Sequence, residues 1–204
     1  MTVGPKRAQS GPTAGRASEE ARPVFVPREA GVGRALRPAF RGKSVHKVDG
    51  KGRVSIPASF RVELRRGDPE WSDGEPPRFI LVHGQARQAG YLECYTIAEM
   101  ARLERKIRKI PTREARENAV RMYITESTYL EVDPNGRIVL PKDLRELIGA
   151  EDELLFLGHL DTFRIALPEV ARAEEEARRA RMIEGDPGSD PLAALDLIPD
   201  EDDE

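Results

Sequence analysis

The stretch VDGKGRVSIP, residues 48–57, decides how this chain folds, because it recurs as VDPNGRIVLP at residues 132–141. In both copies Asp precedes Arg by four residues, Gly stands directly before that Arg, and Pro follows it by four. A second Arg follows each Pro by four residues, at Arg61 and Arg145. A turn with Asp and Gly is common and says little alone. Its recurrence with the whole pattern intact indicates an internal duplication.

Each copy predicts the same series of elements around its turn. A short extended run precedes the turn, at residues 44–48 and 128–132, and an apolar run ending in Pro follows it. Pro suits the first position of a helix, and the predicted helices end at Gly67 and Gly149. A strand–turn–strand unit with one short helix is too small to bury a core alone. We therefore expect the two units to interleave.

Two more strands are predicted after each helix. Residues 79–82 and 91–95 are apolar runs separated by a Gly-containing segment, as are residues 154–157 and 163–167. Each pair is typical of an antiparallel hairpin. The series strand, strand, helix, strand, strand therefore occurs twice. It predicts the α+β class, with a barrel-like antiparallel sheet.

Several of these segments resemble a known family. They are the D-x-x-x-R motifs at Asp49–Arg53 and Asp133–Arg137, the runs that follow them, Phe40-Arg41-Gly42 and Asp161-Thr162-Phe163. In continuous register from residue 40 to residue 168, they resemble MraZ, a family of bacterial transcriptional regulators. The resemblance implies a duplicated swapped-hairpin (AbrB-like) β-barrel with short helices. It also implies binding to double-stranded DNA, ring-shaped homo-oligomers and control of cell-wall and division genes.

The sequence and this resemblance together divide the chain into six segments. Thr96 with Glu99 predicts a capped helix start, Thr112 is expected to cap a second helix, and Gly/Pro-rich flanks are typical of disorder. The segments are a disordered basic extension (1–39), repeat 1 (40–96), a helical linker (97–121), repeat 2 (122–168), a C-terminal helix (169–184) and an acidic disordered tail (185–204). The extension is either a basic arm or the product of an upstream start-codon assignment.

Charge is unevenly distributed along the chain, whose formal net charge is −3. Residues 39–66 carry eight basic and two acidic groups, a net +6, whereas residues 121–167 carry five and nine, a net −4. Residues 168–204 have a net charge of −9. Because local charge decides phosphate binding, repeat 1 is the predicted DNA surface. The tail either competes with DNA for this surface or only aids solubility.

The predicted DNA-binding residues surround the first turn, because Arg can grip guanine edges or phosphates as a fork. Those expected to enter the groove or hold the DNA backbone are Arg53, Lys51, Lys47, Lys43 and Arg41. Asp49 and Gly52 are expected to structure the turn. In the acidic second repeat, Asp133, Gly136 and Arg137 are expected to have a structural or subunit-contact role, with DNA contact as the second interpretation.

Catalytic and metal-binding roles find little support in the sequence. His46, His83 and His159 are scattered, and none stands at a metal-ligand spacing with Cys94. The phosphate-loop pattern is absent, and no nucleophile–base pair is evident. We therefore expect no enzyme, metal, cofactor or small-molecule ligand. Cys94 lies in an apolar run and is expected in the core.

The cellular context is predicted from two further features. A single cysteine fits a reducing compartment, and no apolar run reaches the length of a membrane span. We expect a protein of the cytoplasm and nucleoid that makes no contact with membranes. The alternative function is an antitoxin-like or other protein-binding swapped-hairpin module, in which the charged linker and tail hold a partner. The internal duplication argues against it, because an antitoxin of this group usually carries one repeat.

Overall fold

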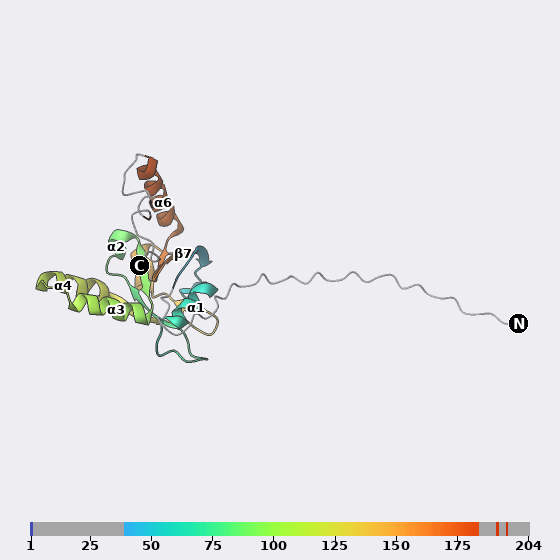
Figure 1. The fold of residues 1–204 in the computed structure, drawn as a ribbon. Coiled ribbons are helices and arrows are strands. Elements are labelled where there is room, and N and C mark those ends of the chain that lie inside the picture. The colour runs from blue at the N-terminus through green and yellow to red at the C-terminus, as the bar shows by residue number, and fades with distance from the viewer. Residues whose placement is uncertain (2–38, 184–190, 192–194, 196–204) are drawn as a thin grey trace. The chain divides into compact units, whose positions relative to one another are not determined.

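The computed structural model describes Met1, residues 39–183, Pro191 and Leu195 (Figure 1). The predicted N-terminal extension, from residue 2 to residue 38, lies outside the described residues. The predicted acidic tail also lies outside them, apart from Pro191 and Leu195. The fold below belongs to the compact unit that spans residues 36–204.

The predicted series of elements is present twice. The first copy contains β1 (Lys43–Lys47), β2 (Arg53–Ser55), α1 (Ala58–Arg66), β3 (Arg78–Val82), the short helix α2 (Ala86–Ala89) and β4 (Tyr91–Tyr95). The second contains β5 (Ser127–Glu131), β6 (Arg137–Val139), α5 (Lys142–Ile148), β7 (Glu153–His159) and β8 (Thr162–Ala166). Gly67 and Gly149 end α1 and α5 as expected. Pro57 and Pro141 occupy the N-cap positions, one residue before the positions predicted for them.

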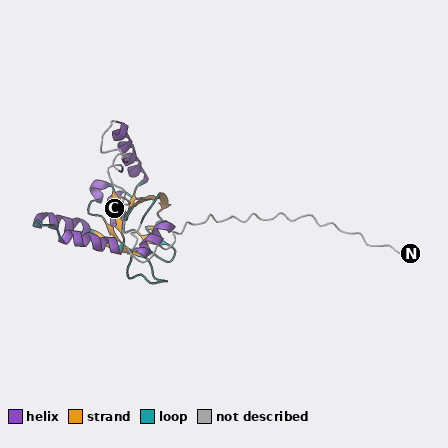
Figure 2. Cartoon of the chain, in the orientation of Figure 1, coloured by secondary structure: helices purple, strands orange, loops and turns teal. Residues whose placement is uncertain are grey.

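The strands form an α+β fold with two antiparallel sheets (Figure 2). The six-stranded sheet has the order β1-β7-β8-β4-β3-β5, and β2 and β6 form a separate two-stranded ribbon. The hairpins β3–β4 and β7–β8 pair as the sequence predicts. The predicted barrel is not closed: β1 and β5 are the two edges of an open six-stranded sheet, and β2 and β6 pair with each other outside it.

The ribbon joins the two repeats. Arg53, Val54 and Ser55 of β2 lie opposite Val139, Ile138 and Arg137 of β6, respectively. Backbone bonds extend the pairing at both ends, from the Ile56 N–H to the Gly136 oxygen and from the Leu140 N–H to the Gly52 oxygen, each 2.9 Å long. Within a repeat, β1 and β2 share only the isolated bridge Val48–Val54. The repeats therefore interleave as expected, with strands of one repeat paired to strands of the other.

The core is shared between the repeats. The Phe163 ring lies 5.0 Å from that of Phe40, 5.3 Å from that of Phe60 and 5.6 Å from that of Phe79, centroid to centroid. All four rings are essentially inaccessible to solvent. Cys94 is fully buried, as predicted, and burial raises the pKa of its thiol. Because each repeat contributes rings to one cluster, neither repeat has a separate core.

The remaining helices lie outside this core. Between the repeats are α3 (Ile97–Arg108), α4 (Arg113–Val120) and the π-helical segment η1 (Arg121–Thr125), and after them comes α6 (Pro168–Ile183). The helices α3 and α4 lie side by side (Figure 1). Thr96 Oγ1 accepts a bond from the Glu99 N–H at 3.2 Å, as the capping signal predicts, whereas the Thr112 side chain caps nothing. Among the described helices, none has the length and apolar character needed to cross a membrane.

Candidate nucleic-acid interface

The first turn is held together by the carboxylate of Asp49. Its Oδ1 accepts hydrogen bonds from the N–H groups of Lys51 (2.9 Å) and Arg53 (3.0 Å), and its Oδ2 accepts one from Arg53 Nε (2.7 Å). The backbone N–H of Arg53 is the main cause that lowers the pKa of Asp49 to about 2. Asp49 therefore stays ionised at neutral pH and fixes the position of the Arg53 side chain.

The second turn repeats this geometry. Asp133 Oδ1 accepts bonds from the N–H groups of Asn135 (2.8 Å) and Arg137 (2.9 Å), and Oδ2 accepts one from Arg137 Nε (3.0 Å). The Arg137 N–H is again the main cause of a lowered pKa at the Asp. Gly52 and Gly136 have φ angles of +76° and +77°, a conformation that favours glycine. The two motifs are therefore equivalent in structure, although their surroundings in the sequence differ in charge.

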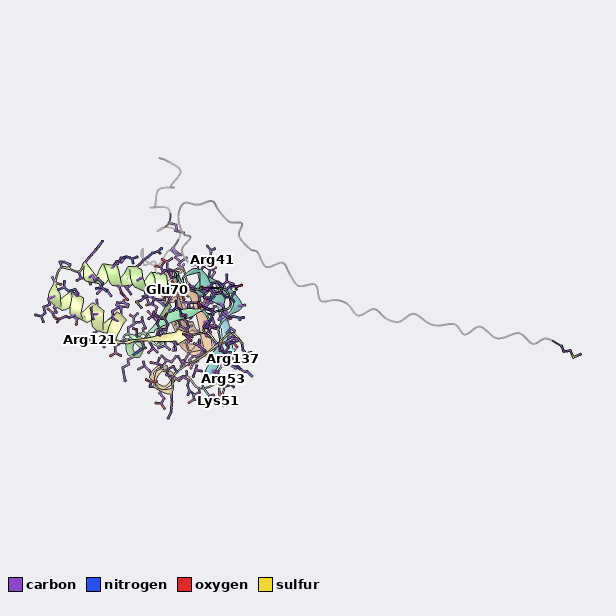
Figure 3. The ribbon with its side chains drawn as sticks, turned by 90° about the horizontal axis from the view of Figure 1, so that it is seen from below. Arg41, Lys51, Arg53, Glu70, Arg121 and Arg137 are labelled. Atoms are coloured by element: carbon purple, nitrogen blue, oxygen red, sulfur yellow. The ribbon has the colours of Figure 1, made fainter. Side chains whose placement is uncertain are left out.

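One face of the ribbon carries both motif arginines. Val54 and Ile138 point inward, each 1% exposed. Because side chains alternate along a strand, Arg53, Ser55, Arg137 and Val139 share the opposite face. Val139 is 57% exposed there. The labels of Lys51, Arg53 and Arg137 lie on one side of the molecule in Figure 3. The ribbon therefore presents two Asp-braced guanidinium groups on one exposed face.

Each turn is also packed against a helix of the other repeat. A Cβ added at Gly52 would lie 2.9 Å from Arg145 Nε, and one added at Gly136 would collide with the guanidinium of Arg61. Arg145 Nε donates to the Leu140 carbonyl oxygen at 3.2 Å. The recurring Pro-x-x-x-Arg spacing was visible in the sequence as part of the duplication. It gave no sign that each of these arginines lies on the turn of the opposite repeat.

The structure does not bring all five predicted DNA-binding residues together. Lys51 and Arg53 lie in the first turn, and Lys47 is two residues before it, at the end of β1. Lys43 is at the other end of β1, about 13 Å away by the rise of a strand. Its Nζ lies 3.3 Å from Glu175 Oε2 of α6. Figure 3 shows Arg41 well apart from Lys51 and Arg53. The predicted set therefore divides into a group at the turn and a group at the start of β1.

The histidines make local contacts rather than a common site. His46 Nε2 is 2.9 Å from Ser44 Oγ, and burial lowers the pKa of His46. His83 Nδ1 lies 3.3 Å from Glu126 Oε2. Within the described part of the chain, no group of three or more His, Cys, Asp or Glu residues is arranged to hold a metal ion.

Comparison with known proteins gives a consistent result. The family model described as "MraZ protein, putative antitoxin-like" matches residues 39–122. A protein of Ruegeria sp. (strain TM1040) named "Transcriptional regulator MraZ" is 42% identical over 159 residues, which cover 77% of this chain and 95% of the relative. Two further relatives have the same name. That of Gluconobacter oxydans is 32% identical over 70% of this chain and 84% of the relative. That of Acetivibrio thermocellus is 37% identical over 58% of this chain and 74% of the relative.

Proposed function

Since the chain belongs to the MraZ family of transcriptional regulators, we propose that it binds DNA sequence-specifically through the β2–β6 ribbon. The observation that carries this proposal is the register of the ribbon, which places Arg53 and Arg137 on one exposed face. A two-stranded ribbon of this kind can enter the major groove, and an arginine fork can bond the O6 and N7 atoms of guanine.

Arg53 is the main reader in this proposal. Its hydrogen bond to Asp49 uses Nε, so its two Nη groups remain as donors for base edges. Lys51 at the tip of the same turn and Lys47 before it hold the phosphate backbone, while Lys43 and Arg41 extend this contact along the DNA. Arg137 Nη2 lies 2.9 Å from Asp133 Oδ2, which supports a structural or subunit-contact role for the second motif, with DNA contact second.

We also propose that the duplicated unit is a swapped hairpin and that the chain assembles into a ring. The pairing of β2 with β6 instead of β1 supports the swap. We keep the proposed boundaries of the repeats at residues 40–96 and 122–168, with the linker at 97–121. One turn offers few contacts, so affinity must come from several subunits together. Ring neighbours share one orientation, which favours short direct repeats in the DNA.

The proposed targets are cell-wall and division genes, including the operon that encodes this chain, and the proposed location is the cytoplasm and nucleoid. Footprinting of the purified protein on the DNA upstream of its own gene tests the proposal, with light scattering to measure assembly. We expect protection of short direct repeats and a species larger than a dimer. A palindromic footprint or a simple dimer contradicts the ring. If no DNA upstream of the gene is protected at any salt concentration, sequence-specific binding at that site is contradicted.

A second candidate is an antitoxin-like module that binds a protein partner. The words "antitoxin-like" in the description of the matching family model favour it. In that function the charged linker and tail hold the partner, and the ribbon has no need to touch DNA. Retention on DNA of a protein shortened to end at Glu184 separates the two, because the regulator keeps its reading surface and the antitoxin loses part of its partner-binding segment.

A further inference from the structure

A crevice of about 340 Å³ lies beside the second turn. Its walls come from helix α1, from the loop that precedes β3 and from the turn itself. Arg61 and Arg65 are four residues apart on α1 and therefore lie on the same side of the helix. Trp71 is in the loop, and the Arg65 guanidinium lies 5.7 Å from the centre of its ring. Two arginines of the first repeat thus line a crevice at the turn of the second.

Within residues 39–183, the guanidinium groups of Arg61 and Arg65 have no anionic partner. Arg61 Nε is buried and has no hydrogen-bond partner within residues 39–183. Across the same range, neither Arg61 nor Arg65 forms an ion pair, whereas the neighbouring Arg66 donates to Glu63 at 2.9 Å. A buried donor without an acceptor is costly. An oxyanion in the crevice would supply the missing acceptor and bond a guanidinium fork in two places.

The acidic groups that line the crevice are mostly engaged elsewhere. Asp133 is bound by its own turn and by Arg137, and Glu75 Oε2 accepts a bond from the Ser72 N–H at 3.2 Å. Asp73 is exposed and is the remaining carboxylate of the lining. Of these three carboxylates only that of Asp133 has a cationic partner in the described part of the chain, so an anion at Arg61 and Arg65 competes with Asp73 and Glu75.

We propose that Arg61 and Arg65 form a phosphate clamp, which holds one backbone phosphate of the DNA that the ribbon reads. This inference rests on the proposed function. The crevice adjoins the second turn, which lies at the end of the ribbon opposite the first turn, so DNA that lies along the whole ribbon would reach it. The clamp also places basic charge from the first repeat at the turn of the acidic repeat. Phosphate contacts fix the register of a protein on DNA without reading its sequence.

The salt dependence of DNA binding tests the clamp, with Arg65→Gln as the variant and Arg66→Gln as its control. Both residues lie in the last turn of α1 and carry the same charge, but Arg66 is paired with Glu63. Arg65→Gln should lower the slope of log K against log salt by about 0.9, the loss of one phosphate contact, equally on specific and unrelated DNA. Arg66→Gln should leave the slope unchanged. Thermal unfolding of each variant checks that the fold is intact.

Two results overturn the clamp while leaving the proposed function in place. One is a wild-type slope in Arg65→Gln, and the other is an equal fall in both variants, which indicates general electrostatic attraction. If the wild-type protein binds no DNA, the proposed function fails and the clamp fails with it. Asp73→Asn should act in the opposite direction and tighten binding, because it removes one of the two competing carboxylates from the crevice.

Trp71 provides a separate readout, because it is the one tryptophan of the chain. Binding of DNA should change its fluorescence emission, and Arg65→Gln should reduce that change. Inorganic phosphate, titrated at constant ionic strength, should have no effect if the bound group belongs to DNA. An equal response to inorganic phosphate and to DNA contradicts the assignment to the backbone and identifies a site for free phosphate. Emission that DNA leaves unchanged contradicts the clamp.

Discussion

Arg53 and Arg137 have equivalent positions in their turns, but we expect unequal effects when they are removed. Arg53→Ala should weaken operator binding by about 1–3 kcal/mol, the usual contribution of a two-pronged base contact. Arg137→Ala should weaken DNA binding less, chiefly by loosening assembly. Binding curves and light scattering on both variants measure the two effects separately. If both variants lose DNA binding equally while assembly stays intact in each, the assignment of DNA contact to Arg53 and of assembly to Arg137 is contradicted.

The aspartates of the turns should titrate at unusually low pH. The pKa of Asp49 is about 2 in the folded chain, against an ordinary value of 3.8. Its contribution to stability is therefore fully present above about pH 4 and is lost as the pH falls through 2. A carboxyl NMR titration should find this midpoint near 2. In Arg53→Ala it should rise only part of the way, because the backbone N–H of residue 53 remains as a donor. A midpoint at 3.8 in the wild type contradicts the observed hydrogen bonds.

For single residues, the sequence predicted contacts within a turn and missed contacts between residues distant in sequence. Asp49 bonds the N–H groups of its own turn and also holds Arg53. An Asp two residues before a backbone N–H is a common turn arrangement. Arg61 was visible only as part of a repeated spacing. Its position against Gly136 depends on the pairing of β2 with β6, which no local pattern contains.

The second turn packs against helix α1 of the first repeat. Gly136→Ala should destabilise the fold by about 1–3 kcal/mol, because φ is +77° there and the new methyl group meets Arg61. Gly50→Ala is the matched control, since a Cβ at that position has no neighbouring atom within 4 Å. Denaturant unfolding of both variants compares the two costs. Similar stabilities for the two variants are inconsistent with the packing of α1 on the second turn.

Element types were easier to predict than element partners. The turn residues, the apolar runs and the glycines after α1 and α5 gave the order strand, strand, helix, strand, strand in both repeats. The predicted barrel is not closed because the edge strands β1 and β5 do not pair with each other, and β2 and β6 form a separate ribbon. Strand pairing depends on contacts distant in sequence, whereas turns and helix ends depend on adjacent residues.

Across residues 39–183, the net charge of a sequence segment is a poor guide to the charge around a site. The second repeat has a net charge of −4 over residues 121–167, yet its turn lies against Arg61 and beside Arg65 of the first repeat. Conversely, Lys43 of the basic repeat faces Glu175 of the acidic C-terminal part, and this contact is the main cause that lowers the pKa of Glu175. Folding thus mixes charges that the sequence keeps in separate blocks.

The acidic C-terminal part should therefore compete with DNA for the lysines of β1. Residues 168–204 hold thirteen acidic and four basic groups, and one of these acids already contacts Lys43. A tethered polyanion has a high effective concentration at a nearby basic surface, so it should raise the apparent dissociation constant for non-specific DNA. A protein that ends at Glu184 should bind such DNA more tightly at low ionic strength. This advantage should shrink as salt screens both interactions. Binding curves of the full-length and shortened proteins at several salt concentrations measure it, and superimposable curves leave the tail with a role in solubility alone.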